Sequence, residues 1–452
     1  MKQWIAENKP YIKTTLQVAW PAVLESFFVA LVGMVDSLMV SRLGTYAVAA
    51  VGLTTQPKFL GLALFIATNV SLSAITARRK GQGDREGANR TLLSALIFVL
   101  LAVCVVSTVC VVFADPLIRW SGSQADTHES AVAYFQIIMG GIVFSVISLA
   151  INAAQRGSGN TKIAMRTNLV SNLVNVLGNF LLIEGRFGLP ALGIRGAAIA
   201  TVIGTVVACA MSIASVFRKD SFVNVGYIIA NKLRATMTDA ISLFKLASSV
   251  LVEQLLIRIG FMSVAIMAAK LGTQEYAAHQ VGMQVMSLSF AFGDGMQVAA
   301  VTLIGQSLGQ KLPEKAKRYG KICQRVGNMI SIALSLLYLT CGRWLFEIFF
   351  PDDAYAVSIG IQIMRIMVLI VLMQVAQVIY MGCLRGAGDV KFTTMASTVS
   401  VTIIRPIVSY LCAYAFSMGV IGIWLGIVGD QVMRLVLTSQ RFKSGKWAKI
   451  EV

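Results

Sequence analysis

Long apolar segments recur along the whole of this 452-residue chain, and they restrict it to a helical fold that spans a membrane. A helix needs about 20 apolar residues to cross the roughly 30 Å of hydrocarbon in a bilayer. Charged residues make up only 13% of the chain, whereas a soluble globular protein carries about a quarter. We therefore predict an all-α integral membrane protein with twelve transmembrane helices. The expected spans are residues 14–39, 47–76, 91–114, 130–153, 163–184, 192–217, 240–269, 276–307, 323–349, 356–383, 393–416 and 420–440.

The net charge of +18 is distributed in a way that predicts orientation rather than a nucleic-acid partner. Every second connection between the expected spans is basic, as in residues 78–90, 156–166 and 385–391, whereas the intervening connections are mixed or acidic. Short cytoplasmic loops are enriched in Lys and Arg, so this alternation places both termini in the cytoplasm. We expect a multi-pass protein of the cell (inner, cytoplasmic) membrane, surrounded by the lipid bilayer and monomeric.

The two halves of the chain repeat each other. The Leu-Gly-Thr segment at 43–45 recurs 228 residues later at 271–273, and the RGSGNTK loop at 156–162 recurs 229 residues later as RGAGDVK at 385–391. Each half has six expected spans, so both halves cross the membrane in the same direction. Transporters built from parallel repeats place their site near the repeat interface and alternate access by rocking. The expected boundaries are an N-terminal lobe at 1–217, a cytoplasmic linker at 218–239, and a C-terminal lobe with a basic tail at 240–452.

Several motifs, taken in order, resemble the multidrug and toxic compound extrusion (MATE) family. They are MVDSLMV at 34–40, RGSGNTK at 156–162, the pattern G-x4-PALG-x2-GAAIAT at 185–201 and RFxxGKW at 441–447. The resemblance covers nearly the whole chain and implies two six-helix lobes in a V shape. It also implies a transporter, not an enzyme, that exports organic cations or metabolites in exchange for Na⁺ or H⁺.

Asp36 is the first candidate for the coupling chemistry, because an ionisable side chain inside a membrane is costly and marks a functional site. It lies in an apolar run without a neighbouring cation. Asn175 and Asn179 are spaced i,i+4 and therefore share a helix face, and Thr201 adds a hydroxyl. Read onto the family pattern, these four residues are cation-site positions for Na⁺ or H⁺, and we expect no other metal or cofactor. Helix packing is the alternative role for the amides and the hydroxyl.

Glu25 and Glu253 occupy equivalent positions of the repeat, 228 residues apart. Glu25 also lies eleven residues before Asp36, close to three helical turns, so both are expected on one face of the first helix. That spacing suggests a polar path through the N-terminal lobe and makes both glutamates candidates for substrate contact. Structural pairing with a cation is the alternative.

The seventh, tenth and eleventh expected spans contain Arg258, Arg365 and Arg405. Arg365 is placed shallow enough to extend its charge outward, so Arg258 and Arg405 are the candidates. Buried arginines need partners, and Asp294 and Glu253 are the acids that the sequence offers. The arginines form either a structural ion-pair network or a surface that contacts anionic or zwitterionic groups of a substrate.

Four glutamines complete the candidates for a substrate cavity, because an amide that faces lipid would lack hydrogen-bond partners. Gln280 and Gln284 are spaced i,i+4, and Gln377 lies in the tenth expected span. Gln374 stands where one branch of the family carries an acid.

These features together predict a secondary antiporter that exports a small organic molecule, cationic or amphipathic, against a coupling cation. A flippase for lipid-linked saccharides from the same broad superfamily is the first alternative. A channel or a membrane sensor that does not transport is the alternative of another class.

Overall fold

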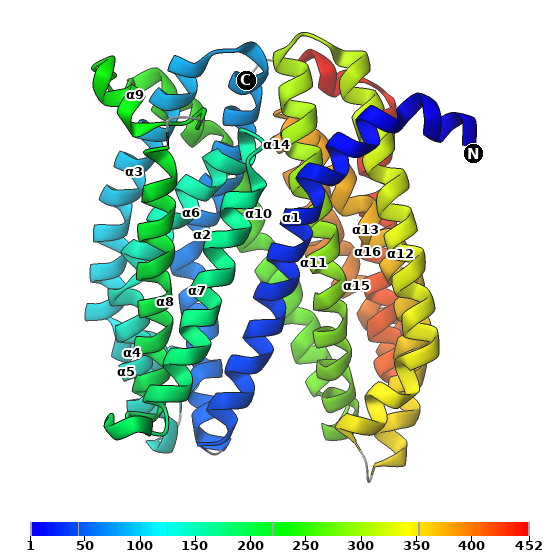
Figure 1. The fold of residues 1–452 in the computed structure, drawn as a ribbon. Coiled ribbons are helices and arrows are strands. Elements are labelled where there is room, and N and C mark those ends of the chain that lie inside the picture. The colour runs from blue at the N-terminus through cyan, green and yellow to red at the C-terminus, as the bar shows by residue number, and fades with distance from the viewer. Residues whose placement is uncertain (1, 44, 124, 219–220, 351–352, 451–452) are drawn as a thin grey trace. The chain divides into compact units, whose positions relative to one another are not determined.

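The computed structural model describes residues 2–43, 45–123, 125–218, 221–350 and 353–450. Regular structure in these ranges is helical throughout, without a strand, which confirms the all-α prediction (Figure 1). The helices of the first half are α1 (Lys2–Ser41), α2 (Thr45–Gln82), α3 (Arg85–Val112), α4 (Ala114–Trp120), α5 (Ala125–Gly140), α6 (Ile142–Gly157), α7 (Thr161–Leu182), η1 (Arg186–Gly188), α8 (Gly193–Val216) and α9 (Val225–Ala230). Those of the second half are α10 (Met237–Ala269), α11 (Thr273–Gly309), α12 (Pro313–Phe349), α13 (Ala354–Gly386), α14 (Val390–Ser397), η2 (Thr398–Ile404), α15 (Arg405–Tyr410), η3 (Leu411–Ala415), α16 (Gly419–Lys443) and η4 (Lys446–Lys449).

At each of the twelve expected spans, the structure has a helix, or consecutive helices, long enough to cross a bilayer. Within the described ranges, ten helices are long and apolar enough to cross a bilayer, and the bent pair α5–α6 makes an eleventh. The twelfth is α7, whose 22 residues extend about 33 Å at 1.5 Å per residue. It carries Lys162 and Arg166 near its beginning, which lowers its mean hydropathy.

The span expected at 130–153 is broken. Its two parts, α5 and α6, meet at an angle of 46°. Gly141 lies at the break and packs against α8 so closely that a Cβ atom there would come within 2.6 Å of the Val202 side chain. The sequence pattern of an uninterrupted apolar run did not predict this bend.

The span expected at 393–416 winds partly as π-helix, in η2 and η3. Pro406 has no backbone N–H to donate to the preceding turn, and Arg405 next to it donates its N–H five residues back, to the carbonyl of Ser400. The widened turn packs on α10, where the Thr402 hydroxyl donates to the carbonyl of Leu256 at 2.8 Å. Such single wide turns are often found at functional sites.

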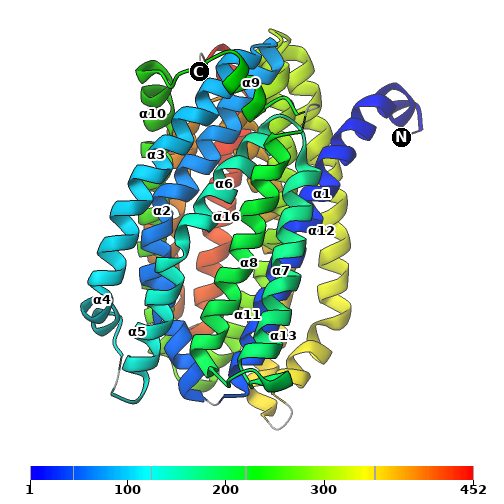
Figure 2. The same ribbon diagram turned by 60° about the vertical axis from the view of Figure 1, so that its left-hand side comes forward.

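The chain forms two compact units, which we call the N-unit (Phe27–Leu251) and the C-unit (Met1–Ser26 with Val252–Val452). In the N-unit, α2 packs on α6, α6 on α8 and α8 on α7, as Figure 2 shows. In the C-unit, α13 packs on α11, α12 and α16. The unit boundaries fall inside α1 and α10, so they differ from the expected boundaries at 217 and 240. These two helices are the first of each sequence repeat, and each one contributes residues to both units.

The expected linker, residues 218–239, is bound to the N-unit over its described part. Asp239 forms an ion pair with Arg79 of α2 at 2.6 Å, and the backbone N–H of Asn224 donates to Asn89 of α3 at 2.7 Å. Residues 221–239 are therefore a docked segment rather than a free tether.

Candidate ion-coupling site

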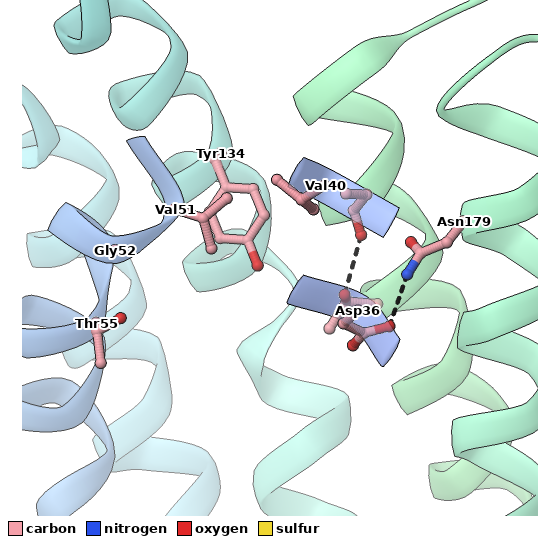
Figure 3. A pocket seen from close by; sticks show the side chains of 9 residues that line it. Asp36, Val40, Val51, Gly52, Thr55, Tyr134 and Asn179 are labelled. Carbon is pink, nitrogen blue, oxygen red and sulfur yellow. Dashed lines mark hydrogen bonds between the residues drawn. The ribbon is translucent and has the colours of Figure 1, made fainter. Parts of the chain in front are cut away.

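A cavity of about 210 Å³ lies inside the N-unit and contains three of the four predicted coupling residues (Figure 3). Helices α1, α2, α5, α7 and α8 surround it. Its lining residues are Asp36, Val40, Val51, Gly52, Thr55, Tyr134, Asn179, Ala197 and Thr201. Thr55 and Tyr134 add hydroxyl groups that the sequence did not single out. Neither residue breaks the pattern of its span, so only the three-dimensional arrangement identifies them.

Two asparagine side chains of α7 contact the Asp36 carboxyl group. Asn179 donates its Nδ2–H to Oδ1 of Asp36 at 2.7 Å, and the two side chains point toward one another in Figure 3. The i,i+4 spacing of Asn175 and Asn179 places both amides on the same helix face, as predicted. Both amides are buried, Asn175 at 6% and Asn179 at 1% exposure, so the carboxylate meets them in a largely dry environment.

The fourth predicted residue, Asn175, completes this arrangement. With its nitrogen turned toward Asp36, it donates at 2.8 Å to Oδ1 and 3.0 Å to Oδ2, while its oxygen lies 3.0 Å from the Thr201 hydroxyl. In the opposite orientation, its nitrogen donates to the Thr201 hydroxyl at 3.0 Å, and its oxygen faces the Asp36 carboxyl. An ionised carboxylate requires the first orientation because it can only accept, whereas a protonated carboxyl can donate to the oxygen in the second. The site can therefore stabilise Asp36 in either state.

Lys58 of α2 is a cation near Asp36 that the sequence analysis missed. No cation neighbours Asp36 in the sequence, but in the folded chain the charge of Lys58 acts on its carboxyl group. The two residues are far apart in sequence, and only helix packing brings them together. A signal was present, since Lys58 is itself an ionisable residue within an expected span.

Glu253, a second predicted site residue, is paired inside the C-unit. Its Oε1 accepts from Nη2 of Arg385 at 2.7 Å, and both side chains are buried. Arg385 lies in the last turn of α13, where the RGAGDVK segment of the second repeat begins, so the pair joins α13 to α10. The structural alternative predicted for Glu253 fits this arrangement.

Glu25 is buried at 8% exposure and belongs to the C-unit, whereas Asp36 belongs to the N-unit. The expectation that both residues line one path through the N-terminal lobe is therefore wrong. The physical reason is that α1 leaves one unit and enters the other after Ser26.

Arg405 has a different partner from the two that were expected. It lies 3.4 Å from Oδ2 of Asp430, which also pairs with Arg434 at 2.6 Å. The Arg405 guanidinium lies over the Phe261 ring at 4.5 Å. The expectation that Asp294 or Glu253 would pair with it is wrong, since packing of α15 on α16 brings Asp430 closer. Asp430 is fully buried, and its i,i+4 spacing with Arg434 was a readable signal.

The remaining candidates are spread over the C-unit. Asp294 is exposed and Arg258 is half-buried. Gln280 and Gln284 are exposed on α11, where Gln280 donates to the Tyr276 hydroxyl at 2.5 Å.

Gln374 and Gln377, by contrast, are fully buried in α13. Gln377 donates to Gln431 of α16 at 3.3 Å. The four glutamines therefore do not form one set, whereas the N-unit gathers its predicted residues around a cavity.

The family model MatE matches residues 21–181 and 250–411, most of the chain and both halves of the repeat. The chain belongs to the MATE family. This MATE transporter is 27% identical to "Probable multidrug resistance protein NorM" of Thermotoga maritima, over 98% of this chain and 95% of the relative. It is 26% identical to "Uncharacterized transporter YisQ" of Bacillus subtilis, over 98% and 97%.

Solved MATE structures share the fold. One described as the outward-facing conformation of a multidrug resistance MATE family transporter matches with a TM-score of 0.89 at 20% identity, over 96% of this chain and 97% of that chain. A transporter from Pyrococcus furiosus, described as having a binding pocket of reverse polarity, matches with a TM-score of 0.88 at 22% identity and the same coverage. The predicted all-α fold with multiple membrane-spanning helices is thereby confirmed.

Proposed function

We propose that this MATE transporter is a secondary antiporter of the cytoplasmic membrane. It exports small organic compounds, cationic or amphipathic, in exchange for an inward flow of H⁺ or Na⁺, and both termini face the cytoplasm. The observation that carries the proposal is the intramembrane carboxylate of Asp36, held by Asn179 beside a cavity of about 210 Å³. The names of relatives such as the Thermotoga maritima protein support a role in multidrug resistance.

The chemistry at Asp36 follows from its surroundings. A carboxylate inside a membrane gains strongly from an incoming cation or proton, because neutralisation removes the cost of a buried charge. The Asn175 amide can offer its nitrogen to an ionised Asp36 or its oxygen to a protonated one. Occupation of Asp36 by the coupling cation can thus change the packing of α1, α7 and α8.

Alternating access requires the two units to rearrange, and α1 and α10 are the helices that such a movement must deform, because each belongs to both units. Pro21 lies in α1 five residues before the change of unit. A proline inside a helix removes one backbone hydrogen bond and makes bending easier. Bending of α1 next to the segment that carries Asp36 would couple the ion site to the movement.

Reconstituted protein in liposomes tests the proposal, with ethidium as the transported organic cation. Ethidium movement is measured under a pH gradient alone, a Na⁺ gradient alone and no gradient. We expect one cation gradient to drive transport against the ethidium gradient, and Asp36→Asn to abolish that drive while the variant is expressed and inserted normally. Undiminished transport by the Asp36→Asn variant would overturn the role of Asp36. Gradient dissipation without exchange would indicate a channel, and movement of lipid-linked saccharides instead of ethidium would indicate a flippase.

A further inference from the structure

Lys58 is an ionisable residue inside a membrane-spanning helix of the N-unit, and it has no role in the antiport cycle proposed above. It follows Thr45, the first residue of α2, by thirteen positions, which corresponds to a depth of about 20 Å along the helix. A lysine at that depth is too far from the nearer helix end to extend its ammonium easily into water. The Lys58 side chain is half-buried and not fully exposed. Intramembrane lysines are retained for a function or a partner.

Helix geometry directs Lys58 toward the Asp36 cavity. Val51 and Thr55 line that cavity, and Lys58 follows them at i+7 and i+3, so the three side chains share one face of α2. The Lys58 ammonium and the Asp36 carboxylate lie within electrostatic range of one another. A charged side chain on the lining face of α2 thus acts on the coupling residue.

Among the described residues that line the cavity, those from α5, α7 and α8 carry no charge. Tyr134 of α5 is the other titratable group near the carboxylate, and its phenol is neutral at ordinary pH. Helices α7 and α8 contribute neutral amides and a hydroxyl. The charge balance of the described site is therefore set by one carboxylate and one ammonium.

We propose that the Lys58 ammonium is a tethered counter-ion of Asp36, that it takes the electrostatic place of Na⁺, and that the exchanged ion is H⁺. This inference rests on the proposed function, in which Asp36 is the coupling site, and it names the ion. A resident cation near a carboxylate repels a second cation, and for two like unit charges roughly 6 Å apart at an effective permittivity near 20 this repulsion lowers the affinity about a hundredfold.

A proton meets the same repulsion, but it forms a covalent O–H bond to one carboxyl oxygen, whereas Na⁺ is held by electrostatic attraction alone. The proton arrives at one Asp36 oxygen from outside and leaves from the same atom toward the cytoplasm. When Asp36 is neutral, the flexible four-carbon stem of Lys58 lets its ammonium move away from the carboxyl. Lys58 is thus a positioning residue, because it acts through Asp36.

Binding of radioactive Na⁺ to the purified, detergent-solubilised protein tests the inference without a transported substrate. We expect weak Na⁺ binding by the natural protein and at least tenfold tighter, saturable binding by Lys58→Met. Adding Asp36→Asn to that variant should remove the gained binding. Lys58→Arg keeps the cation and should behave as the natural protein does. Lys162→Met removes an exposed lysine of the same unit and is the matched control.

Equal Na⁺ affinity in the natural protein and in Lys58→Met would overturn the inference. If Lys58→Met does not elute from gel filtration as the natural protein does, Na⁺ binding by the natural protein becomes the test. Tight, saturable Na⁺ binding by the natural protein would contradict a resident counter-ion. In liposomes, we expect a pH gradient but not a Na⁺ gradient to drive ethidium transport. Transport driven by Na⁺ would overturn the inference and leave antiport intact. If Na⁺ binds to the variants as expected but neither gradient drives ethidium transport, the result would instead contradict the proposed function.

Discussion

Asn179 donates a hydrogen bond of 2.7 Å to Oδ1 of Asp36, and this contact joins α7 to α1 beside the N-unit cavity. The carboxylate accepts in a charge-assisted bond, which is roughly twice as strong as a neutral one. Because Asn179 is almost completely buried, water cannot readily replace its amide. Asp36 therefore depends on Asn179 for its orientation as well as for stabilisation of its charge.

Replacement of Asn179 by Ala removes this donor and should slow cation-driven transport by about ten- to a hundredfold, since a hydrogen bond to a charged group contributes about 1.5–3 kcal/mol. The loss should be smaller than in Asp36→Asn, which removes the carboxylate itself. Initial rates of ethidium transport in liposomes measure the effect. Asn231→Ala changes an exposed asparagine of the same unit and should transport at the natural rate. A natural rate in Asn179→Ala would show that Asp36 does not need the amide.

The residues that meet at the candidate site could be predicted from the sequence, because each one departs from the apolar pattern of its span. Their role in coupling stays a prediction. Asp36, Asn175 and Asn179 are polar side chains at depth, and helical spacing places the two amides together. Lys58 could have been found by the same argument. Its proximity to Asp36 could not, because it depends on how α1 packs against α2.

The unit boundaries could not be read from the repeat. A repeat gives the lengths and order of helices, but it does not show that α1 contributes Lys2–Ser26 to one unit and Phe27–Ser41 to the other. For the same reason Glu25 was placed in the wrong unit. The partner of Arg405 was missed because Asp430 lies in another span, and its distance depends on the wide turns before α15.

Two adjacent glycines at the α5–α6 break give a matched test of packing. A Cβ atom at Gly141 would come within 2.6 Å of the Val202 side chain, whereas one at Gly140 would meet nothing within 4 Å. Gly141→Ala should therefore destabilise the protein by about 1–3 kcal/mol through overpacking, and Gly140→Ala should have little effect. Thermal unfolding in detergent measures both variants. Equal midpoints for the two would contradict the close packing of α6 on α8.

The ion pair between Asp239 and Arg79 should hold the linker segment 221–239 on the N-unit. Lys232 and Arg234 in this segment are exposed and are sites for trypsin. In Asp239→Asn, loss of a charged hydrogen bond should raise the population of the undocked segment about tenfold, and cleavage follows that population when docking is fast. The rate of trypsin cleavage at these two residues is the measurement. Glu86→Gln changes an exposed residue of the same unit and should be cleaved as slowly as the natural protein. If Asp239→Asn were cleaved equally slowly, contacts other than this ion pair would hold the segment.

Asp430 lies between two buried arginines of the C-unit, Arg405 at 3.4 Å and Arg434 at 2.6 Å. Asp430→Asn leaves both guanidinium groups without their carboxylate, and breaking a buried ion pair in this way costs about 3–5 kcal/mol. The thermal unfolding midpoint in detergent should fall clearly. Replacing Arg405 by Met in the same protein should cost less than the sum of the two single changes, because the second change removes a charge that the first left unpaired.

The matched control for Asp430 is the exposed pair Arg343–Glu347, which has the same i,i+4 spacing and a separation of 2.7 Å. Exposed ion pairs contribute little because water and salt screen them, so Glu347→Gln should leave the unfolding midpoint unchanged. If Asp430→Asn were equally harmless, the Arg405 and Arg434 charges would have to be neutralised by something other than Asp430. Full additivity of Asp430→Asn and Arg405→Met would likewise show that the two residues do not stabilise each other. The structural interpretation of these C-unit arginines, rather than a substrate-binding one, depends on that coupling.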